Sequence, residues 1–114
     1  MEGNKITNQS DRRLKTNIVD TPVDSLSAIS KWGFKAFDRV NNGTHDDVGL
    51  IAQDTSEIVV YDEENDTYYI DSSKQIMMNS HGIQQLNTKV DDEITQLKAK
   101  IASLQDELAQ LKGD

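Results

Sequence analysis

The chain has 114 residues, of which 35 % are hydrophobic, and its 20 acidic and 12 basic residues give a formal net charge of −8. This size allows one small domain, and the low apolar content excludes an extensive core within a single chain, so association with further copies is the expected source of burial. The acidic balance argues against nucleic acid as the main partner, no apolar run is long enough to span a membrane, and the lack of cysteine excludes disulfides and thiolate metal sites.

A serine and a lysine stand five residues apart near the beginning of the chain, as Ser10 and Lys15. A deprotonated lysine can act as the general base for a serine nucleophile, so such a pair is a minimal device for cleaving an acyl bond. Attack by Ser10 on the carbonyl before it would cut the chain between Gln9 and Ser10. Taken alone, the spacing is weak evidence, because it is common in polar sequences and a solvated turn explains it better.

The segment that follows predicts an extended stretch and then a brief helix. Residues 16–21 end just before Pro22, and a residue that precedes proline favours extended backbone. Asp24 or Ser25 can cap a short helix over residues 26–29.

The middle of the chain is predicted to consist of strand and loop. Alternation over residues 31–36 would place Trp32 and Phe34 on one face of a strand. Turn-forming residues predict a loop over residues 41–47. The apolar run at residues 48–52 predicts a short buried strand or a strand-to-helix junction.

A hairpin and the start of a long helix are predicted next. The β-rich runs at residues 57–62 and 67–71 are separated by an acidic turn at residues 63–66. Ser72, with Gln75 three residues later, matches a capping box at the start of the helix.

The C-terminal third carries a heptad pattern typical of a coiled coil. With Ile94 at position a, the apolar residues at a and d form a continuous seam, and we expect its core to consist of Val90, Ile94, Leu97, Ile101, Leu104, Leu108 and Leu111. Toward the N-terminal side the seam becomes more polar, with Asn87 at an a position. Glu93 at g precedes Lys98 at e, the spacing of an ion pair between parallel helices. Parallel, in-register association is therefore predicted.

Gly82 interrupts the helical pattern and is the expected point at which the helix leaves the small domain. From Ile83 to Lys112 the helix would be about 45 Å long. The alternative is a lone amphipathic helix packed on its own domain, but the strict a and d stripe is narrower than the face that such a helix buries. The residue types at a and d leave dimer and trimer open.

Metal and cofactor chemistry has little support, and we expect neither. His45 and His81 are far apart in the sequence, and a zinc site would need further ligands, so both are interpreted as surface histidines. The acidic residues after His45 lack the alternating oxygen ligands of a calcium loop. The sequence contains no phosphate-binding loop, dinucleotide glycine motif or nucleophile elbow.

Four motifs in one order, followed by the coil, resemble a known family. They are Ser10–Ile18 (SDRRLKTNI), Trp32–Phe34 (WGF), Val48–Gln53 (VGLIAQ) and Tyr69–Asp71 (YID). Together they resemble the intramolecular chaperone domain of phage tailspikes and tail fibres, the self-cleaving S74 peptidase family. This family is known from endosialidase tailspikes, Bacillus phage neck appendage proteins and a myelin regulatory transcription factor. The resemblance extends from residue 10 to about residue 111.

The resemblance implies an α+β fold, in which a small mixed domain with short strands carries a long C-terminal helix that forms a parallel coiled coil in a homotrimer. It divides the chain into an upstream fibre segment (1–9), a chaperone and autoprotease domain (10–82) and a trimerisation helix (83–114). Such a domain stands at the C-terminus of a longer fibrous polypeptide, brings three chains into register and then releases itself. The host cell cytoplasm during virion assembly would be its location, with the mature client in the virion tail.

The resemblance also implies catalytic roles for the serine and lysine near the beginning of the chain, with Ser10 as nucleophile and Lys15 as general base. Ser10 would attack the Gln9 carbonyl to form an ester, which water would hydrolyse. Lys15 must be neutral to act, which desolvation or the neighbouring arginines would favour and Asp11 would oppose. We read Asp11 and the two arginines as structural or interchain contacts.

The expected partners are two further copies of the chain and the upstream fibre or tailspike domain of the same polypeptide, which is the folding client. No nucleic acid and no membrane are expected to take part. The rival interpretation is a purely structural oligomerisation module, which shares every feature except a working Ser10 and Lys15. A DNA-linked regulator of the myelin factor type is disfavoured, since the chain has no basic region and no membrane span.

Overall fold

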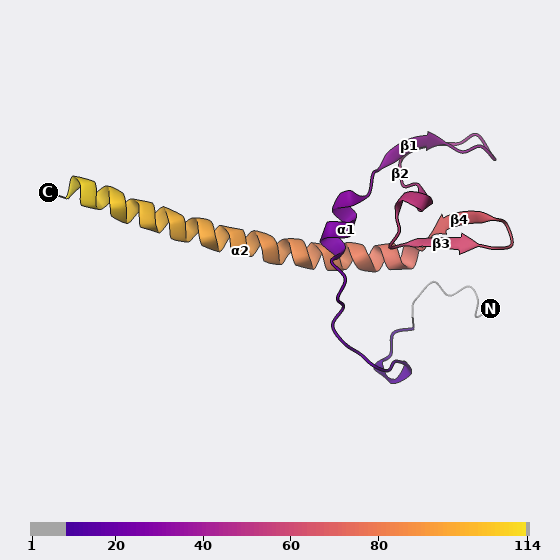
Figure 1. The fold of residues 1–114 in the computed structure, drawn as a ribbon, viewed down its shortest axis with the longest axis horizontal. Coiled ribbons are helices and arrows are strands. Elements are labelled where there is room, and N and C mark those ends of the chain that lie inside the picture. The colour runs from indigo at the N-terminus through magenta and orange to yellow at the C-terminus, as the bar shows by residue number, and fades with distance from the viewer. Residues whose placement is uncertain (1–8, 114) are drawn as a thin grey trace.

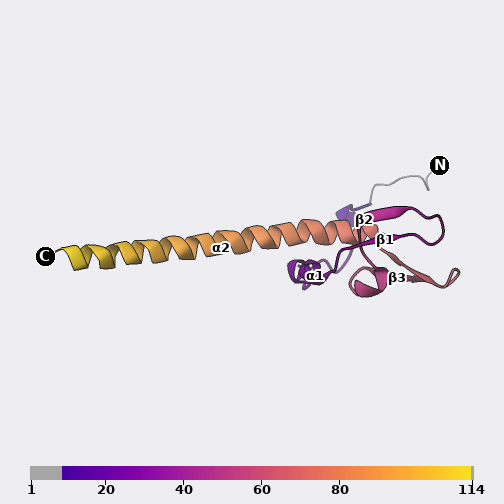
Figure 2. The same ribbon diagram turned by 90° about the horizontal axis from the view of Figure 1, so that it is seen from above.

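The computed structural model describes residues 9–113 and shows a small mixed head at one end of a single long helix (Figure 1). The molecule measures 80 × 43 × 22 Å, because the helix extends far beyond the head, as Figure 2 also shows from above. In chain order the elements are η2 (Arg12–Leu14), α1 (Ser25–Lys31), β1 (Lys35–Asp38), β2 (His45–Gly49), η3 (Ala52–Asp54), β3 (Val59–Asp62), β4 (Thr67–Ile70) and α2 (Ser72–Lys112). The prediction of an α+β fold with a long C-terminal helix is confirmed.

The predicted hairpin after residue 57 is present. Strands β3 and β4 pair antiparallel, from Val59 opposite Ile70 to Asp62 opposite Thr67. Its turn contains Asp66 at φ 50°, a left-handed conformation that aspartate tolerates better than most residues.

A second hairpin, β1 with β2, differs from the sequence prediction. Trp32 does not share a strand with Phe34; it caps the C-terminus of α1 and is 6 % exposed, whereas Phe34 is 54 % exposed. The strand begins only at Lys35. Burial of the large Trp32 indole in the core stabilises the fold more than a strand extended back to residue 31 would. The predicted loop is also shorter, since β2 starts at His45 and pairs with β1. The expected short strand or strand-to-helix junction is the end of β2 followed by η3.

The hydrophobic core is small, as the composition predicts. Its buried members are Ala28, Trp32, Ile58 and Met78. They bring together α1, the β3 side of the head and the first turns of α2. The indole Nε1–H of Trp32 donates a hydrogen bond of 3.0 Å to Glu57 Oε1, so the buried tryptophan has a partner for its polar atom.

This hydrogen bond makes the stability of the head depend on pH. It is the main cause that lowers the pKa of Glu57 below the ordinary value of 4.5. A carboxyl whose pKa is lowered by folding contributes stability above its unfolded pKa and loses that contribution as the pH falls through the folded value. We therefore expect the urea midpoint, followed by the fluorescence of Trp32, to fall as the pH drops from about 5 to about 3. Glu57→Gln should flatten this fall, while Glu63→Gln in the exposed β3–β4 turn should not; equal slopes in both variants would contradict the assignment.

Helix α2 runs without interruption from Ser72 to Lys112, so the prediction that Gly82 breaks it is wrong. Gly82 is buried against α1, where an added Cβ would lie 2.9 Å from Ile29 Cδ1. The glycine is therefore explained by close packing of two helices. The N-cap also lies one residue earlier than predicted, since Asp71 Oδ1 accepts from the backbone N–H of Lys74 at 3.0 Å. Among the described residues no helix is both long and apolar enough to cross a membrane.

Candidate functional site

The segment that precedes α1, residues 9–24, is exposed at every position and is called the arm below. Its one regular element is the single turn η2, which Asp11 caps by accepting the backbone N–H of Arg13 at 2.9 Å. Asp11 Oδ2 also pairs with Arg13 Nη2 at 2.7 Å, and this hydrogen-bonded partner lowers the pKa of Asp11. The interpretation of Asp11 as a structural contact agrees with this geometry.

The turn brings Ser10 and Lys15 together. Lys15 Nζ donates to Ser10 Oγ at 2.5 Å, and the backbone N–H of Lys15 closes the turn on the carbonyl of Arg12 at 3.1 Å. Two residues five apart thus become neighbours, because η2 folds the chain back between them. The Asp11 carboxylate is held by Arg13, and the described ion pairs include none between Asp11 and Lys15.

The pair has the contact that base-assisted attack by a serine requires, but it lies in solvent. Ser10, Lys15 and Gln9 are all exposed. Water stabilises the ammonium form of a lysine, whereas a general base must be neutral, so a desolvating cover is needed for this chemistry. The catalytic roles of Ser10 and Lys15, and the bond between Gln9 and Ser10 as the cleavage site, stay predictions.

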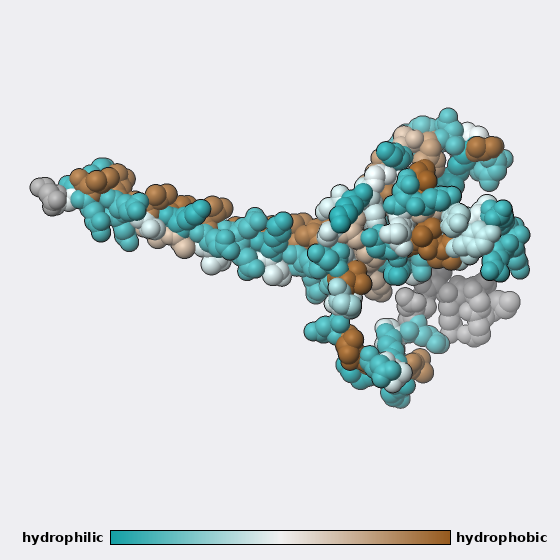
Figure 3. Space-filling model, in the orientation of Figure 1, coloured by the Kyte–Doolittle hydropathy of each residue, from teal (hydrophilic) through white to brown (hydrophobic). Residues whose placement is uncertain are grey.

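The predicted coiled-coil core residues lie on an exposed apolar stripe of α2. Their exposed fractions range from 42 % at Val90 to 85 % at Leu111, with the other five between them: Ile94, Leu97, Ile101, Leu104 and Leu108. Figure 3 shows this stripe as brown side chains along the helix, toward its C-terminal end. An apolar surface of this length on an otherwise polar helix is typical of an association surface.

The head packs on the opposite side of the same helix. In the heptad register, the buried and half-buried residues within α2 all fall at positions b, c and f: Gln75, Met78, His81, Gly82 and Gln85. The a and d positions are exposed from the first turns onward, including Ile76 at d, which is 60 % exposed. The seam is therefore exposed along the whole of α2, beside the head as well as beyond it, and it reaches back to Ile76, which lies outside the predicted core.

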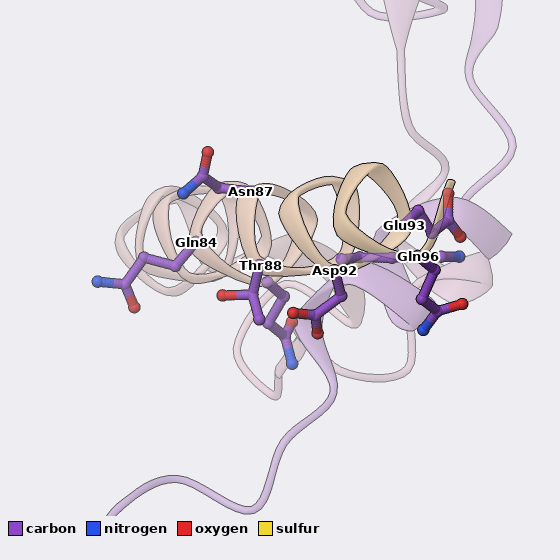
Figure 4. Close-up of a pocket in the computed structure, with 8 residues that line it drawn as sticks. Gln84, Asn87, Thr88, Asp92, Glu93 and Gln96 are labelled. Atoms are coloured by element: carbon purple, nitrogen blue, oxygen red, sulfur yellow. The ribbon is translucent and has the colours of Figure 1, made fainter. Parts of the chain in front are cut away.

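A polar hollow in the middle of α2 does not form a binding pocket. Figure 4 shows the labelled side chains, among them Gln84, Asn87 and Asp92, splayed away from a single helix. All of the residues that line it belong to α2, so there is no second wall to enclose a ligand.

The two histidines have structural contacts. His45 Nδ1 lies 2.6 Å from Asp38 and its Nε2 lies 3.1 Å from Asp47, all within the exposed β1–β2 hairpin. His81 Nδ1 lies 2.7 Å from the hydroxyl of Ser25 and so links α2 to the start of α1. His81 is half-buried rather than a surface residue, which a sequence pattern without the α1–α2 contact could not indicate. Within residues 9–113 no group of three acidic, histidine or cysteine side chains is placed to hold a metal ion.

Comparison with known families gives one match, and it begins at the serine of the pair. The family model Peptidase_S74, described as chaperone of endosialidase, matches residues 10–65. The matched region contains Ser10, Lys15, α1, the β1–β2 hairpin and the start of the β3–β4 hairpin, while α2 lies beyond it. No curated protein and no solved structure matches the chain. The resemblance inferred from the motifs is confirmed over residues 10–65, which carry all of the motifs except Tyr69–Asp71, and through these residues the chain belongs to the Peptidase_S74 family, the chaperones of endosialidase.

Proposed function

We propose that the chain is a C-terminal intramolecular chaperone of a phage tailspike or tail-fibre protein. It would trimerise, bring three upstream chains into register for folding, and then release itself by cleavage between Gln9 and Ser10. The observation that carries this proposal is the arrangement of α2, whose head-binding face is opposite a free apolar seam. The family match supports the chaperone role.

Trimerisation through α2 has a physical rationale. A parallel coil would bury the exposed seam, and pairs such as Glu93 with Lys98 and Glu107 with Lys112 would add ion pairs between neighbouring helices. Interwound β-folds depend on contacts between distant parts of several chains, so their nucleation is slow and exposes them to aggregation. A coil that holds three chain ends together raises their effective concentration and fixes their register.

Self-cleavage would proceed through an acyl shift at the Gln9–Ser10 bond. Neutral Lys15 accepts the hydroxyl proton of Ser10, and Oγ attacks the Gln9 carbonyl carbon. The bond to the Ser10 nitrogen then breaks, and the nitrogen leaves as an amine with the transferred proton. Water hydrolyses the resulting ester to give a Gln9 carboxylate and a free Ser10 hydroxyl. Loss of the chaperone after folding would leave the client kinetically trapped, because the element that nucleated it is gone.

The proposal is tested by fusing residues 1–114 behind a tail-fibre β-domain that needs an intramolecular chaperone. The intact chain should yield soluble trimeric client without the domain attached. A variant with Leu97→Asp and Leu104→Asp on the seam should yield aggregated client. Equal amounts of soluble trimer from both would reject the chaperone role.

A Ser10→Ala fusion separates the proposal from the purely structural module. If the domain is both chaperone and protease, this variant should give trimeric client that still carries the domain. If the unsubstituted fusion also keeps its domain, the non-catalytic oligomerisation module is the better description. During assembly the protein would act in the host cell cytoplasm, and its client would end in the virion tail.

A further inference from the structure

The arm carries aliphatic side chains that its own chain does not cover. Leu14, Ile18 and Val19 are 66 %, 53 % and 80 % exposed. Over residues 16–23 the described contacts include no backbone–backbone hydrogen bond, and the N–H of Val23 bonds only to the hydroxyl of Thr21. An extended segment with apolar side chains and free backbone groups is suited to dock on another surface.

The arm leaves the molecule along one flank of the α2 seam. Thr21 and Val23 share a hollow with Lys74, Met77 and His81 of α2. Met78 of α2 lines the same hollow. In the heptad register Met77 is at e, Lys74 and His81 are at b and Met78 is at f, so the arm starts on the outer face of the helix, on its e side. Figure 1 shows it passing α2 to the side away from the β1–β2 hairpin.

An apolar groove lies on the other flank at nearly the same level. It has a volume of about 380 Å³ and is formed by Leu26 and Ile29 of α1 with Asn79, Gly82, Ile83 and Leu86 of α2. Asn79 and Leu86 are at g and Ile83 is at d. Four of the six residues are aliphatic, so the groove suits side chains such as isoleucine and valine.

In a parallel coiled coil the e flank of one helix lies beside the g flank of the next. The arm of each copy would then emerge beside the groove of its neighbour, because the hollow at residues 74–81 of α2 and the groove at residues 79–86 overlap along the axis. Resting on the trimer of the proposed function, we propose that Ile18 and Val19 of one copy dock in the groove between α1 and α2 of the neighbouring copy.

Charge favours the same arrangement. Residues 1–24 contain four basic and four acidic residues, so residues 25–114 carry the whole formal net charge of −8. The turn that holds the Ser10–Lys15 pair is basic, with Arg12, Arg13 and Lys15 against Asp11. A basic turn is attracted to the acidic head of another copy. Docking would also cover the pair and remove water from Lys15, so the catalytic site is complete only when a neighbour is present.

Cross-linking tests directly whether the arm of one copy docks on its neighbour (the arm exchange), since the chain contains no cysteine that would interfere. Chains with Val19→Cys and chains with Leu86→Cys are refolded together, oxidised, and analysed by mass and light scattering. We expect trimers in which a disulfide joins one chain of each kind. The matched control pairs Leu86→Cys with Val40→Cys, since Val40 is also a fully exposed valine but lies at the end of the β1–β2 hairpin. The control should give at least tenfold less of the mixed product.

The outcomes separate the inference from the proposed function. Trimers in which Val19→Cys cross-links no better than Val40→Cys would overturn the exchange and leave the trimer intact. Chains that scatter as monomers would overturn both. As a second readout, Val19→Asp should remain trimeric, and its rate of cleavage at the Gln9–Ser10 bond should fall at least tenfold. The control Val40→Asp should be cleaved at the parental rate. Cleavage of Val19→Asp at the parental rate would contradict the docking.

Discussion

Lys15→Arg should abolish the proposed cleavage between Gln9 and Ser10 while leaving the fold of the chain unchanged. Arginine keeps the positive charge and can still donate a hydrogen bond to Ser10 Oγ, but it does not lose its proton in proteins and so cannot act as a base. Ser10→Ala removes the nucleophile and should likewise leave the chain whole. General-base assistance contributes about 10²- to 10⁴-fold to such reactions, so the loss should be of that order or larger.

The measurement is the intact mass of the purified chain over time, in which cleavage appears as loss of residues 1–9. Lys89→Ala is the matched control, because Lys89 is an exposed lysine at position c of α2, away from both the arm and the seam. It should be cleaved at the parental rate. Cleavage of Lys15→Arg at the parental rate would show that this lysine is not the base.

Leu97→Asp should convert the proposed trimer to monomers. Leu97 is at d, near the middle of the seam, and is 57 % exposed on the single chain, so association would bury three leucines in one layer. Burial of a leucine is worth roughly 1.5–3 kcal/mol, and three aspartates in the same layer would lose that gain and repel one another. The mass from light scattering should fall to that of one chain.

The control for this substitution lies two residues away on the same helix. Ala99→Asp introduces the same charge at position f, on the outer face of α2, and should leave the trimer intact. A parental trimer with Leu97→Asp would place the interface elsewhere. Dimers in the parental chain would contradict the proposed homotrimer.

Local patterns in the sequence predict the elements whose stabilising contacts are themselves local. The long helix α2, the cap of α1 at Asp24 and the β3–β4 hairpin depend on residues a few positions apart, and each was predicted correctly in type, while the coiled coil that the heptads indicate stays a prediction. The errors at Trp32 and Gly82 arise from contacts with residues distant in the sequence. Trp32 turns into a core that includes Met78, and Gly82 admits the side chain of Ile29.

In the candidate site, too, the features set by local contacts could be predicted and those set by distant contacts could not. The spacing of Ser10 and Lys15 predicted a pair, and a turn capped by Asp11 is what brings them into contact. Their exposure was not predictable, because it depends on where the arm travels relative to α1 and α2. The flank on which the arm leaves and the flank that carries the groove are likewise set by how α1 packs on α2.

Because the head is attached only to the first part of α2, the length of the rest of the helix can change without changing the contacts of the head. The contacts of α1 with α2 extend as far as Gln85 and Leu86, and the helix continues from there to Lys112. Deletion of one whole heptad from that distal part would shorten the rod and change the phase between head and seam by only about 20°. Deletion of three residues would rotate the distal seam by about 60° relative to the head. Rods of different length, each trimmed or extended by whole heptads, can therefore carry the same head in the same orientation.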